Sequence, residues 1–304
     1  MLFRVERLWG RRYNIKSTPL GGVFFKMLRI APIIEDYFSH HHLHPHFKLF
    51  QECVSTQPMD LSFDMNFNTE EQPLAMVQQL NALVDHIRAR GQSKKFSAAC
   101  KNFHRSSDKN HREILAYVKR HSELTGRLLI GRCDVGVKKA AKFHLGSRMQ
   151  QLKTLRKARI ALFDFIKSKF GGRFLGFAWK LEFGPKRGFH LHLMFIFNGR
   201  DLNSDIPIVR MIGEHWKHEI MGGGGTYYNC NAFKGSYKEC GIGQYSKNID
   251  SGKWKGIELM CAYLTKPDDL VRLHFKGMRT FAKGNFPKDK QKKSKTMTEL
   301  AAGG

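Results

Sequence analysis

The sequence is poor in acidic residues relative to basic ones. Its 26 Asp and Glu stand against 52 Lys and Arg, a formal net charge of +26 at pH 7. A surplus of this size favours a polyanionic partner, nucleic acid or an anionic membrane surface, although ribosomal and histone-like proteins are also basic. The chain also lacks the run of about 18–20 apolar residues that spans a bilayer. Its first residues, MLFRVERLWGRRYNIK, are charged throughout and do not form a secretory signal. We therefore expect a cytoplasmic protein that binds nucleic acid and no membrane.

Cysteine pairs with metal-binding or redox spacing are missing as well. The six cysteines include no C-x-x-C pair, and the chain of 304 residues is long enough to build a core without disulfides. Reduced, structural thiols are the favoured interpretation. The ten-residue spacing of Cys230 and Cys240 does not favour a zinc knuckle. There is also no internal repeat.

Residues 1–122 are expected to form a basic, mostly helical region. Apolar residues recur at helical spacing in 73–91, which ends at a glycine, and 94–105 and 111–126 also predict helices. The histidine tract around His42-Leu43-His44 is interpreted as a surface loop. At the other end of the chain, residues 283–304 are charged and rich in small residues, which predicts a disordered basic tail.

Residues 123–282 show a different pattern, in which strands and helices alternate. The predicted order is β-α-β-β-α-β-α, an α+β domain whose helices pack on an antiparallel sheet. The elements expected are strands at 126–137, 174–183 and 189–197, helices at 147–172, 206–220 and 255–266, and strand with loop at 226–247.

Two histidines lie one residue apart in an otherwise apolar strand, RGFHLHLMFIFNG at 187–199. Alternate residues of a strand share a face, so His190 and His192 project together. A hairpin symmetric about Lys186 places Glu182 opposite His190, with Cβ atoms about 5 Å apart. Two imidazoles and a carboxylate then form a facial set for a divalent metal with open positions. A His-x-His pair alone more often marks two satisfied histidines, but the hairpin, the opposed glutamate and the basic charge together favour a metal.

This pattern, histidine–hydrophobic–histidine led by a glutamate eight residues earlier across a glycine-containing turn, resembles the HUH single-strand endonucleases. Within that family it is similar to the replication initiators of filamentous phages and their chromosomal relatives. The resemblance implies a ferredoxin/RRM-like fold and Mg²⁺ or Mn²⁺ held by Glu182, His190 and His192. It also implies a tyrosine nucleophile on a later helix, often in Y-x-x-K, and CAYLTKPDD at 261–269 supplies Tyr263 and Lys266 in that pattern.

The activity that the resemblance implies is metal-dependent, sequence-specific nicking and rejoining of single-stranded DNA through a 5′-phosphotyrosine. Such a reaction starts rolling-circle replication of a phage or mobile element at its origin. Residues i and i+3 share a helix face, so Tyr263 and Lys266 can meet one phosphate. Relatives with two catalytic tyrosines carry both on one helix, whereas the helix at 255–266 has Tyr263 alone, which implies a one-tyrosine enzyme. Tyr245, in GQYSKNID at 243–250, is the alternative nucleophile.

Basic residues on the helix at 147–172 and in the hairpin turn are expected to bind DNA phosphates, with affinity that falls steeply with salt. A solvated helix face is the alternative. Trp216, Tyr227, Tyr228 and Phe233 are either stacking platforms for unpaired bases or core residues. The residues expected to bind DNA are Arg148, Lys153, Arg156, Lys157, Lys186 and Arg187.

Two other functions stay open. Metal-dependent oxygenases and cupin-like proteins also use two histidines and a carboxylate, but they place the acid a few residues after the pair, and the nearest one here is Asp201. A non-catalytic DNA-binding regulator of a mobile element would explain the charge, although an intact residue set argues against a decayed site. Residues 1–122 carry no motif of the family. They either add DNA contacts or recruit a host helicase or polymerase.

Overall fold

The computed structural model describes residues 1–8, 12–37, 41–56, 66–139, 141, 145–184, 187–250, 252–266, 271–273 and 279–287. The chain forms two compact units. The first is Met1–Asn110 with Lys266–Thr280, and the second is His111–Thr265 with the chain from Phe281 on, of which residues 281–287 are described. No helix in these ranges is both long and apolar enough to cross a bilayer.

The first unit is built mainly from helices, with short strands that the sequence pattern did not reveal. Strands β1, β2 and β4 form a small antiparallel sheet, and β3 pairs with β10. The elements are β1 (Phe3–Arg7), β2 (Tyr13–Ser17), α1 (Pro19–Tyr37), β3 (His41–Leu43), α2 (Pro45–Thr56), β4 (Asn66–Phe67), α3 (Glu71–Gly91), the first part of α4 (Lys94–Thr125) and β10 (Val271–Leu273).

Of two local expectations for residues 1–126, one was incomplete and the other was wrong. The helices predicted at 94–105 and 111–126 are confirmed, but they join into one continuous helix, α4, because the polar residues between them each cost only a few tenths of a kcal/mol in a helix. The tract expected as a surface loop instead forms β3 and the start of α2. There the backbone N–H of His46 donates to His44 Nδ1 at 3.3 Å, so His44 caps a helix that begins with proline.

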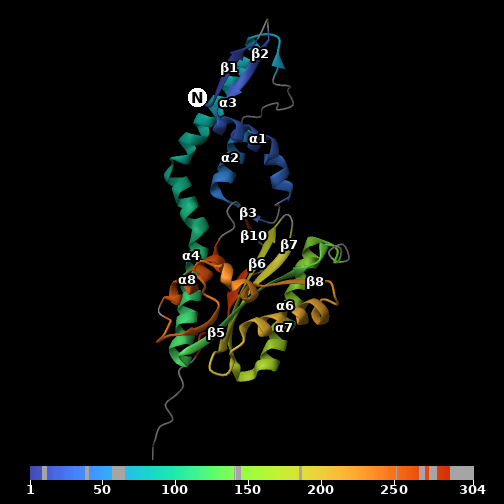
Figure 1. The fold of residues 1–304 in the computed structure, drawn as a ribbon. Helices are drawn as coiled ribbons and strands as arrows, with labels where there is room; N and C mark the ends of the chain where they lie inside the picture. The colour runs from blue at the N-terminus through green and yellow to red at the C-terminus, as the bar shows by residue number, and fades with distance from the viewer. Residues whose placement is uncertain are drawn as a thin grey trace, which may run out of the picture. The chain divides into compact units, whose positions relative to one another are not determined.

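The second unit confirms the predicted α+β class, with helices packed on an antiparallel sheet (Figure 1). Within the described residues the six strands have the order β11-β6-β7-β5-β8, and β9 also pairs with β5. The elements are the end of α4, β5 (Arg127–Val137), α6 (Arg148–Phe170), η1 (Gly171–Arg173), β6 (Phe174–Gly184), β7 (Gly188–Asn198), α7 (Asp205–His215), η2 (Trp216–Ile220), β8 (Gly225–Asn229), η3 (Cys230–Ser236), β9 (Gly243–Ser246), α8 (Lys253–Thr265) and β11 (Phe281–Lys283).

The end of the chain differs in part from the predicted tail. Phe281–Lys283 is strand β11, which pairs with Ala178–Lys180 at the edge of the sheet, so Lys283 belongs to the fold. Of the tail predicted at 283–304, residues 288–304 lie outside the described residues. The domain boundaries predicted at 122 and 282 stay predictions.

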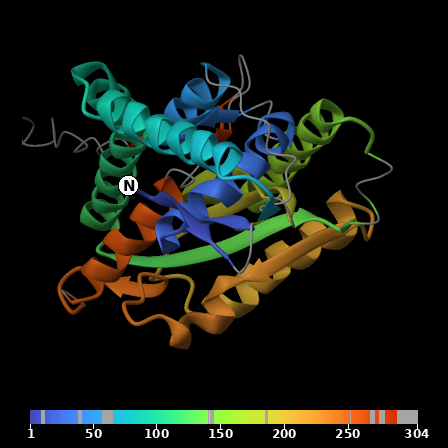
Figure 2. The same ribbon diagram turned by 90° about the horizontal axis from the view of Figure 1, so that it is seen from above.

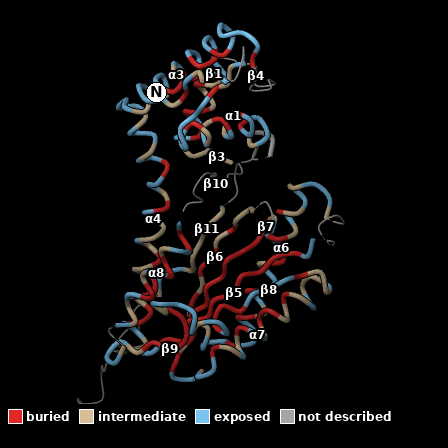
Figure 3. Tube along the Cα trace, turned by 45° about the horizontal axis from the view of Figure 1, so that its top comes forward, coloured by how far each residue is buried: buried red, intermediate tan, exposed pale blue. Residues whose placement is uncertain are grey.

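Helices cover both faces of the large sheet, so its central strands β5 and β7 are buried along almost their whole length (Figure 3). On one face Met194 and Ile196 of β7 pack with the end of α4 and with α8, and we call this the α8 face. On the other, Phe195 of β7 and Phe177 of β6 contact Phe163 of α6 at 6.3 and 4.2 Å between ring centroids. We call this the α6 face. In Figure 2, β5 (green) and β8 (orange) run side by side, and β8 lies at the edge of the sheet opposite to β11.

A buried histidine on α4 makes the stability of this unit depend on pH. His121 is 3% exposed, its Nε2 has no hydrogen-bond partner in the described part of the chain, and burial lowers its pKa to about 4. Below its ordinary value of about 6.5 the unfolded chain therefore binds a proton that the folded chain excludes, so stability falls with falling pH. The free energy of unfolding, measured with urea, should fall between about pH 7 and about pH 4 in both chains. We expect the fall in His121→Leu to be smaller than that in the parent chain by up to about 3 kcal/mol. Parallel pH profiles would contradict this.

Candidate active site

The hairpin of β6 and β7 sets the register of the site. Glu182 pairs with His190 and Lys180 pairs with His192, so the pairing predicted from the turn is confirmed. Lys186, which was expected to bind DNA, lies outside the described residues. Strand alternation then places both histidines and Glu182 on the α8 face, beside Met194 of the same strand.

Glu182, His190 and His192 bring one ligand atom each to within 4.8 Å of one another. Glu182 Oε2 is 3.0 Å from His192 Nε2 and 3.6 Å from His190 Nε2. Both histidines are buried, at 7% and 1% exposed, while the Glu182 side chain is 21% exposed and forms the accessible side of the cluster. Lys180 Nζ donates to the other carboxylate oxygen, Oε1.

The outer ring nitrogens of both histidines are already engaged. His192 Nδ1 is 2.6 Å from Asp134 Oδ1, and His190 Nδ1 is 2.9 Å from the carbonyl oxygen of Gly188. When Nδ1 carries the proton in these bonds, each Nε2 presents a lone pair to the Glu182 carboxylate. Two nitrogen donors and one carboxylate oxygen held in this way fit a divalent cation, and carboxylates or carbonyls commonly orient histidine ligands from behind.

The charges around the cluster favour a positive charge at its centre. Burial would lower the pKa of His192, but hydrogen bonds with Asp134 and Glu182 outweigh it and raise that pKa above its ordinary value. Burial would likewise raise the pKa of Glu182, yet its bonds to the two histidines hold it well below the ordinary range. Burial would also raise the pKa of Asp134, but its hydrogen bond with His192 lowers it below the ordinary value. Both carboxylates are therefore ionised, and the site attracts a cation.

Asp134 was missed by the sequence reasoning and positions His192. It lies on β5 directly opposite His192 and is 9% exposed. Outer carboxylates of this kind typically contribute about 10- to 100-fold to metal affinity. We expect Asp134→Ala to weaken Mn²⁺ binding by that factor in calorimetric titration. Asp134→Asn still accepts the hydrogen bond from His192 Nδ1, so its affinity for Mn²⁺ should lie between those of the parent chain and Asp134→Ala. Asp164→Ala, on the exposed side of α6, is the control, and equal losses in Asp134→Ala and Asp164→Ala would remove the assigned role.

Tyr263 is brought to the cluster by α8. The buried residues Ile257, Cys261 and Leu264 anchor this helix in the core of the α8 face. Tyr263 itself is 52% exposed, and its ring centroid lies 5.8 Å from that of His192 with the rings nearly perpendicular. Lys266 directly follows α8, which ends at Thr265, and it is exposed.

Tyr245, the alternative nucleophile, is not brought to the cluster. It lies on β9 opposite Leu128, is 4% exposed, and packs against Trp254 with ring centroids 5.9 Å apart. Leu128 precedes Asp134 by six residues on the same strand, which separates Tyr245 from the cluster by about 20 Å. Burial also raises the pKa of the Tyr245 phenol.

The basic residues expected to bind DNA are divided between two places. Lys153, Arg156 and Lys157 are exposed, but α6 covers the face of the sheet opposite to the cluster. At the start of α6, the Arg148 guanidinium lies 5.1 Å from the ring centroid of Phe183. Arg187, which is 58% exposed in its side chain, reaches the cluster, 4.0 Å from Asp134 Oδ2.

The four aromatic residues that were expected to be either stacking platforms or core residues fall into two groups. Trp216 is fully buried and its Nε1 donates to the carbonyl oxygen of Gly136, and the Tyr227 hydroxyl donates to Glu214. Both are therefore structural. Tyr228 and Phe233 are 42% and 52% exposed and stack on each other, with centroids 5.0 Å and planes 6° apart.

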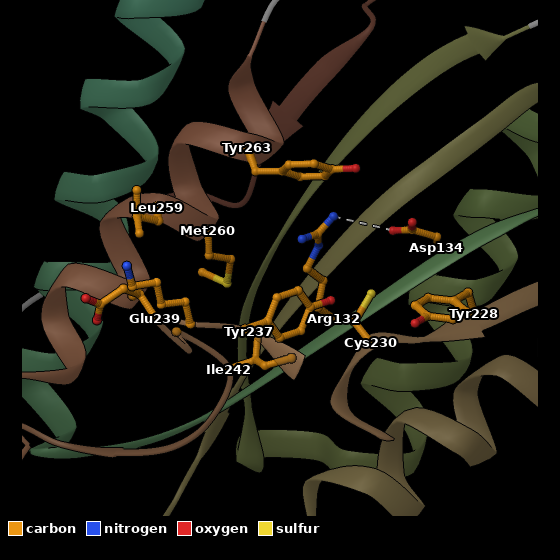
Figure 4. A pocket seen from close by; sticks show the side chains of 13 residues that line it. Arg132, Asp134, Tyr228, Cys230, Tyr237, Glu239, Ile242, Leu259, Met260 and Tyr263 are labelled. Atoms are coloured by element: carbon orange, nitrogen blue, oxygen red, sulfur yellow. Dashed lines mark ion pairs between the residues drawn. The ribbon is translucent and has the colours of Figure 1, made fainter. Parts of the chain in front are cut away.

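A cavity of about 470 Å³ opens beside Tyr263 (Figure 4). Arg132, a second residue that sequence reasoning missed, lies beneath the Tyr263 ring, with its Cζ 4.3 Å from the ring centroid. Its Nη2 is 3.7 Å from Asp134 Oδ1. Alternation along GRCDVGV puts Arg132 and Asp134 on the same face of β5, and that signal was present in the sequence.

No protein-family model, curated protein or solved structure matches the chain. The function therefore has to be inferred from the geometry of the site.

Proposed function

We propose that the second unit is an HUH-type endonuclease with a ferredoxin/RRM-like core, which nicks and rejoins single-stranded DNA through tyrosine. One observation carries the proposal. A half-exposed phenol, Tyr263, stands 5.8 Å between ring centroids from His192 of a Glu-His-His cluster that fits a divalent cation. A buried histidine pair with a structural role alone would need neither the converging carboxylate nor a phenol at its accessible side.

Glu182, His190 and His192 would hold Mg²⁺ or Mn²⁺, which supplies Lewis-acid polarisation of a phosphate oxygen when bound. The chain's own residues do the rest. Asp134 fixes the ring of His192, and Lys180 holds one oxygen of Glu182 so that the other faces the imidazoles. This rigid arrangement leaves little reorganisation for the reaction itself.

Tyr263 is the nucleophile in this proposal. Its phenol loses its proton as the oxygen bonds to phosphorus. The bond from phosphorus to the 3′ oxygen breaks, and that oxygen takes up a proton to become a free 3′-hydroxyl. The guanidinium of Arg132, 4.3 Å from the ring, favours the developing phenolate. Attack by the 3′-hydroxyl on the phosphotyrosine reverses the step, so rejoining needs no further energy source.

The free 3′-hydroxyl can prime synthesis, so we assign the protein to the start of rolling-circle replication at the origin of a phage or mobile element. Arg187 would hold the strand at the cleaved phosphate and Lys266 would bind it after α8. Lys153, Arg156 and Lys157 would contact DNA away from the nick, because α6 covers the other face of the sheet. Residues 1–122 would add DNA contacts or recruit a host helicase or polymerase.

Transfer of a labelled strand to the protein tests the proposal. Single-stranded oligonucleotides labelled at the 3′ end, which stays on the fragment joined to tyrosine, are tiled across the DNA that flanks the gene. They are incubated with the full chain and Mn²⁺ or Mg²⁺, then separated on a denaturing protein gel. A label that migrates with the protein only when metal is present supports the endonuclease. Tight binding of every oligonucleotide without any transfer would overturn it in favour of a non-catalytic regulator.

A further inference from the structure

The cavity beside Tyr263 has the size and walls of a binding site. Its volume of about 470 Å³ falls within the range of about 300–1,000 Å³ typical of ligand pockets. Side chains from β5, β8 with η3, the segment after η3 and α8 line it (Figure 4). The lining includes Arg132, Tyr228, Cys230, Tyr237, Leu259 and Met260.

The wall contains flat aromatic surface that is open to solvent. Tyr228 is 42% exposed although it is already stacked on Phe233, and Tyr237 is 39% exposed. Exposed aromatic rings grouped at one concave place commonly mark a binding surface. Rings of this kind stack on nucleobases, since every base has a π-face.

One of the residues that line the cavity has a polar atom without a hydrogen-bond partner. Arg132 is 7% exposed, and its Nε has no hydrogen-bond partner in the described part of the chain. A guanidinium carries donors only, so an occupant of the cavity that offers an acceptor would satisfy it. Nucleobases present ring nitrogens and carbonyl oxygens in the plane that a guanidinium recognises.

The position of the cavity links it to the reaction. Arg132 touches Tyr263 from below at 4.3 Å and Asp134 at 3.7 Å, so the cavity lies next to both the nucleophile and the metal cluster. We propose, resting on the proposed function, that it receives the unpaired base of the nucleotide that adjoins the cleaved phosphate. The base stacks against Tyr237 and Tyr228, and its acceptors take the hydrogen bond of Arg132. A base paired in a duplex cannot enter, so the pocket selects single-stranded DNA.

The test compares two ten-nucleotide probes of equal charge, a thymidine homopolymer and a fully abasic strand, by fluorescence anisotropy with the full chain in EDTA. The parent chain should prefer the probe with bases. Tyr237→Ala should reduce that preference about 5- to 150-fold, the contribution of one stacked base. Leu259→Trp is designed to fill the cavity from its exposed side, and it should also reduce the preference for the probe with bases. Phe286→Ala is the matched control, because Phe286 is also exposed, at 47%, and does not line the cavity.

The slope of log affinity against log salt concentration reports contacts with phosphates and not base stacking. Tyr237→Ala should therefore leave this slope unchanged. If both cavity variants keep the full preference for bases while folding like the parent in thermal unfolding, the pocket proposal is wrong, even if the label-transfer assay finds an adduct. If the preference collapses but no adduct forms, the cavity is a base-binding site, while the endonuclease proposal and the position of the base beside a cleaved phosphate both fall.

Discussion

His190→Ala and His192→Ala should each weaken Mn²⁺ binding by more than about 100-fold, a larger loss than an outer-sphere change produces. Each substitution removes one of three donors whose atoms lie within 4.8 Å of one another. The remaining two donors leave the cation weakly held and more open to water. Calorimetric titration of the full chain measures the affinity, and the label-transfer assay should lose the adduct in parallel.

His218→Ala is the matched control for this pair, because His218 is 54% exposed in its side chain and pairs with Glu214, away from the cluster. It should bind Mn²⁺ as the parent does. If His190→Ala and His192→Ala fold normally and bind Mn²⁺ with unchanged affinity, the cluster is not a metal site and the histidines are structural.

Tyr263→Phe should lower the rate of adduct formation by more than about 10⁴-fold, the scale on which loss of a catalytic nucleophile reduces a rate. The substitution keeps the ring that faces His192 and Arg132 and removes only the attacking oxygen. Binding of single-stranded DNA should therefore stay within a few-fold of the parent, which separates chemistry from recognition. Gel-based single-turnover assays measure the first quantity and anisotropy the second.

Tyr245→Phe is the matched variant on the other candidate tyrosine. Because Tyr245 is buried in the core at the far end of β5, we expect adduct formation at close to the parent rate. An adduct that survives in Tyr263→Phe and disappears in Tyr245→Phe would reverse the assignment, and the sheet would then have to open around β9 for the reaction.

The parts of the site that could be predicted from sequence are those set by local geometry. A short turn fixes the pairing of its two strands, so Glu182 could be placed opposite His190 from spacing alone. The helix predicted at 255–266 is likewise observed as α8 (Lys253–Thr265), and it carries Tyr263.

The remaining parts depend on contacts between segments far apart in the chain. Asp134 reaches His192 only because β5 inserts next to β7, and no local signal in the sequence fixes that neighbour. The position of α6 is also set by distant contacts. Its basic residues were expected to bind DNA phosphates, but the helix packs on the face of the sheet opposite to the cluster. Strands β1, β2 and β11 were missed because five or fewer residues give too short a pattern to distinguish a strand from a loop.

Peptide mapping of the covalent adduct tests the central claim most directly. After label transfer, tryptic digestion separates the two candidates, because Tyr245 lies in ECGIGQYSK and Tyr263 in the peptide that begins GIELMCAYLTK. The account predicts a nucleotide on Tyr263, in a phosphodiester that forms only with divalent metal. A nucleotide on Tyr245, or on no tyrosine of the second unit, would contradict it.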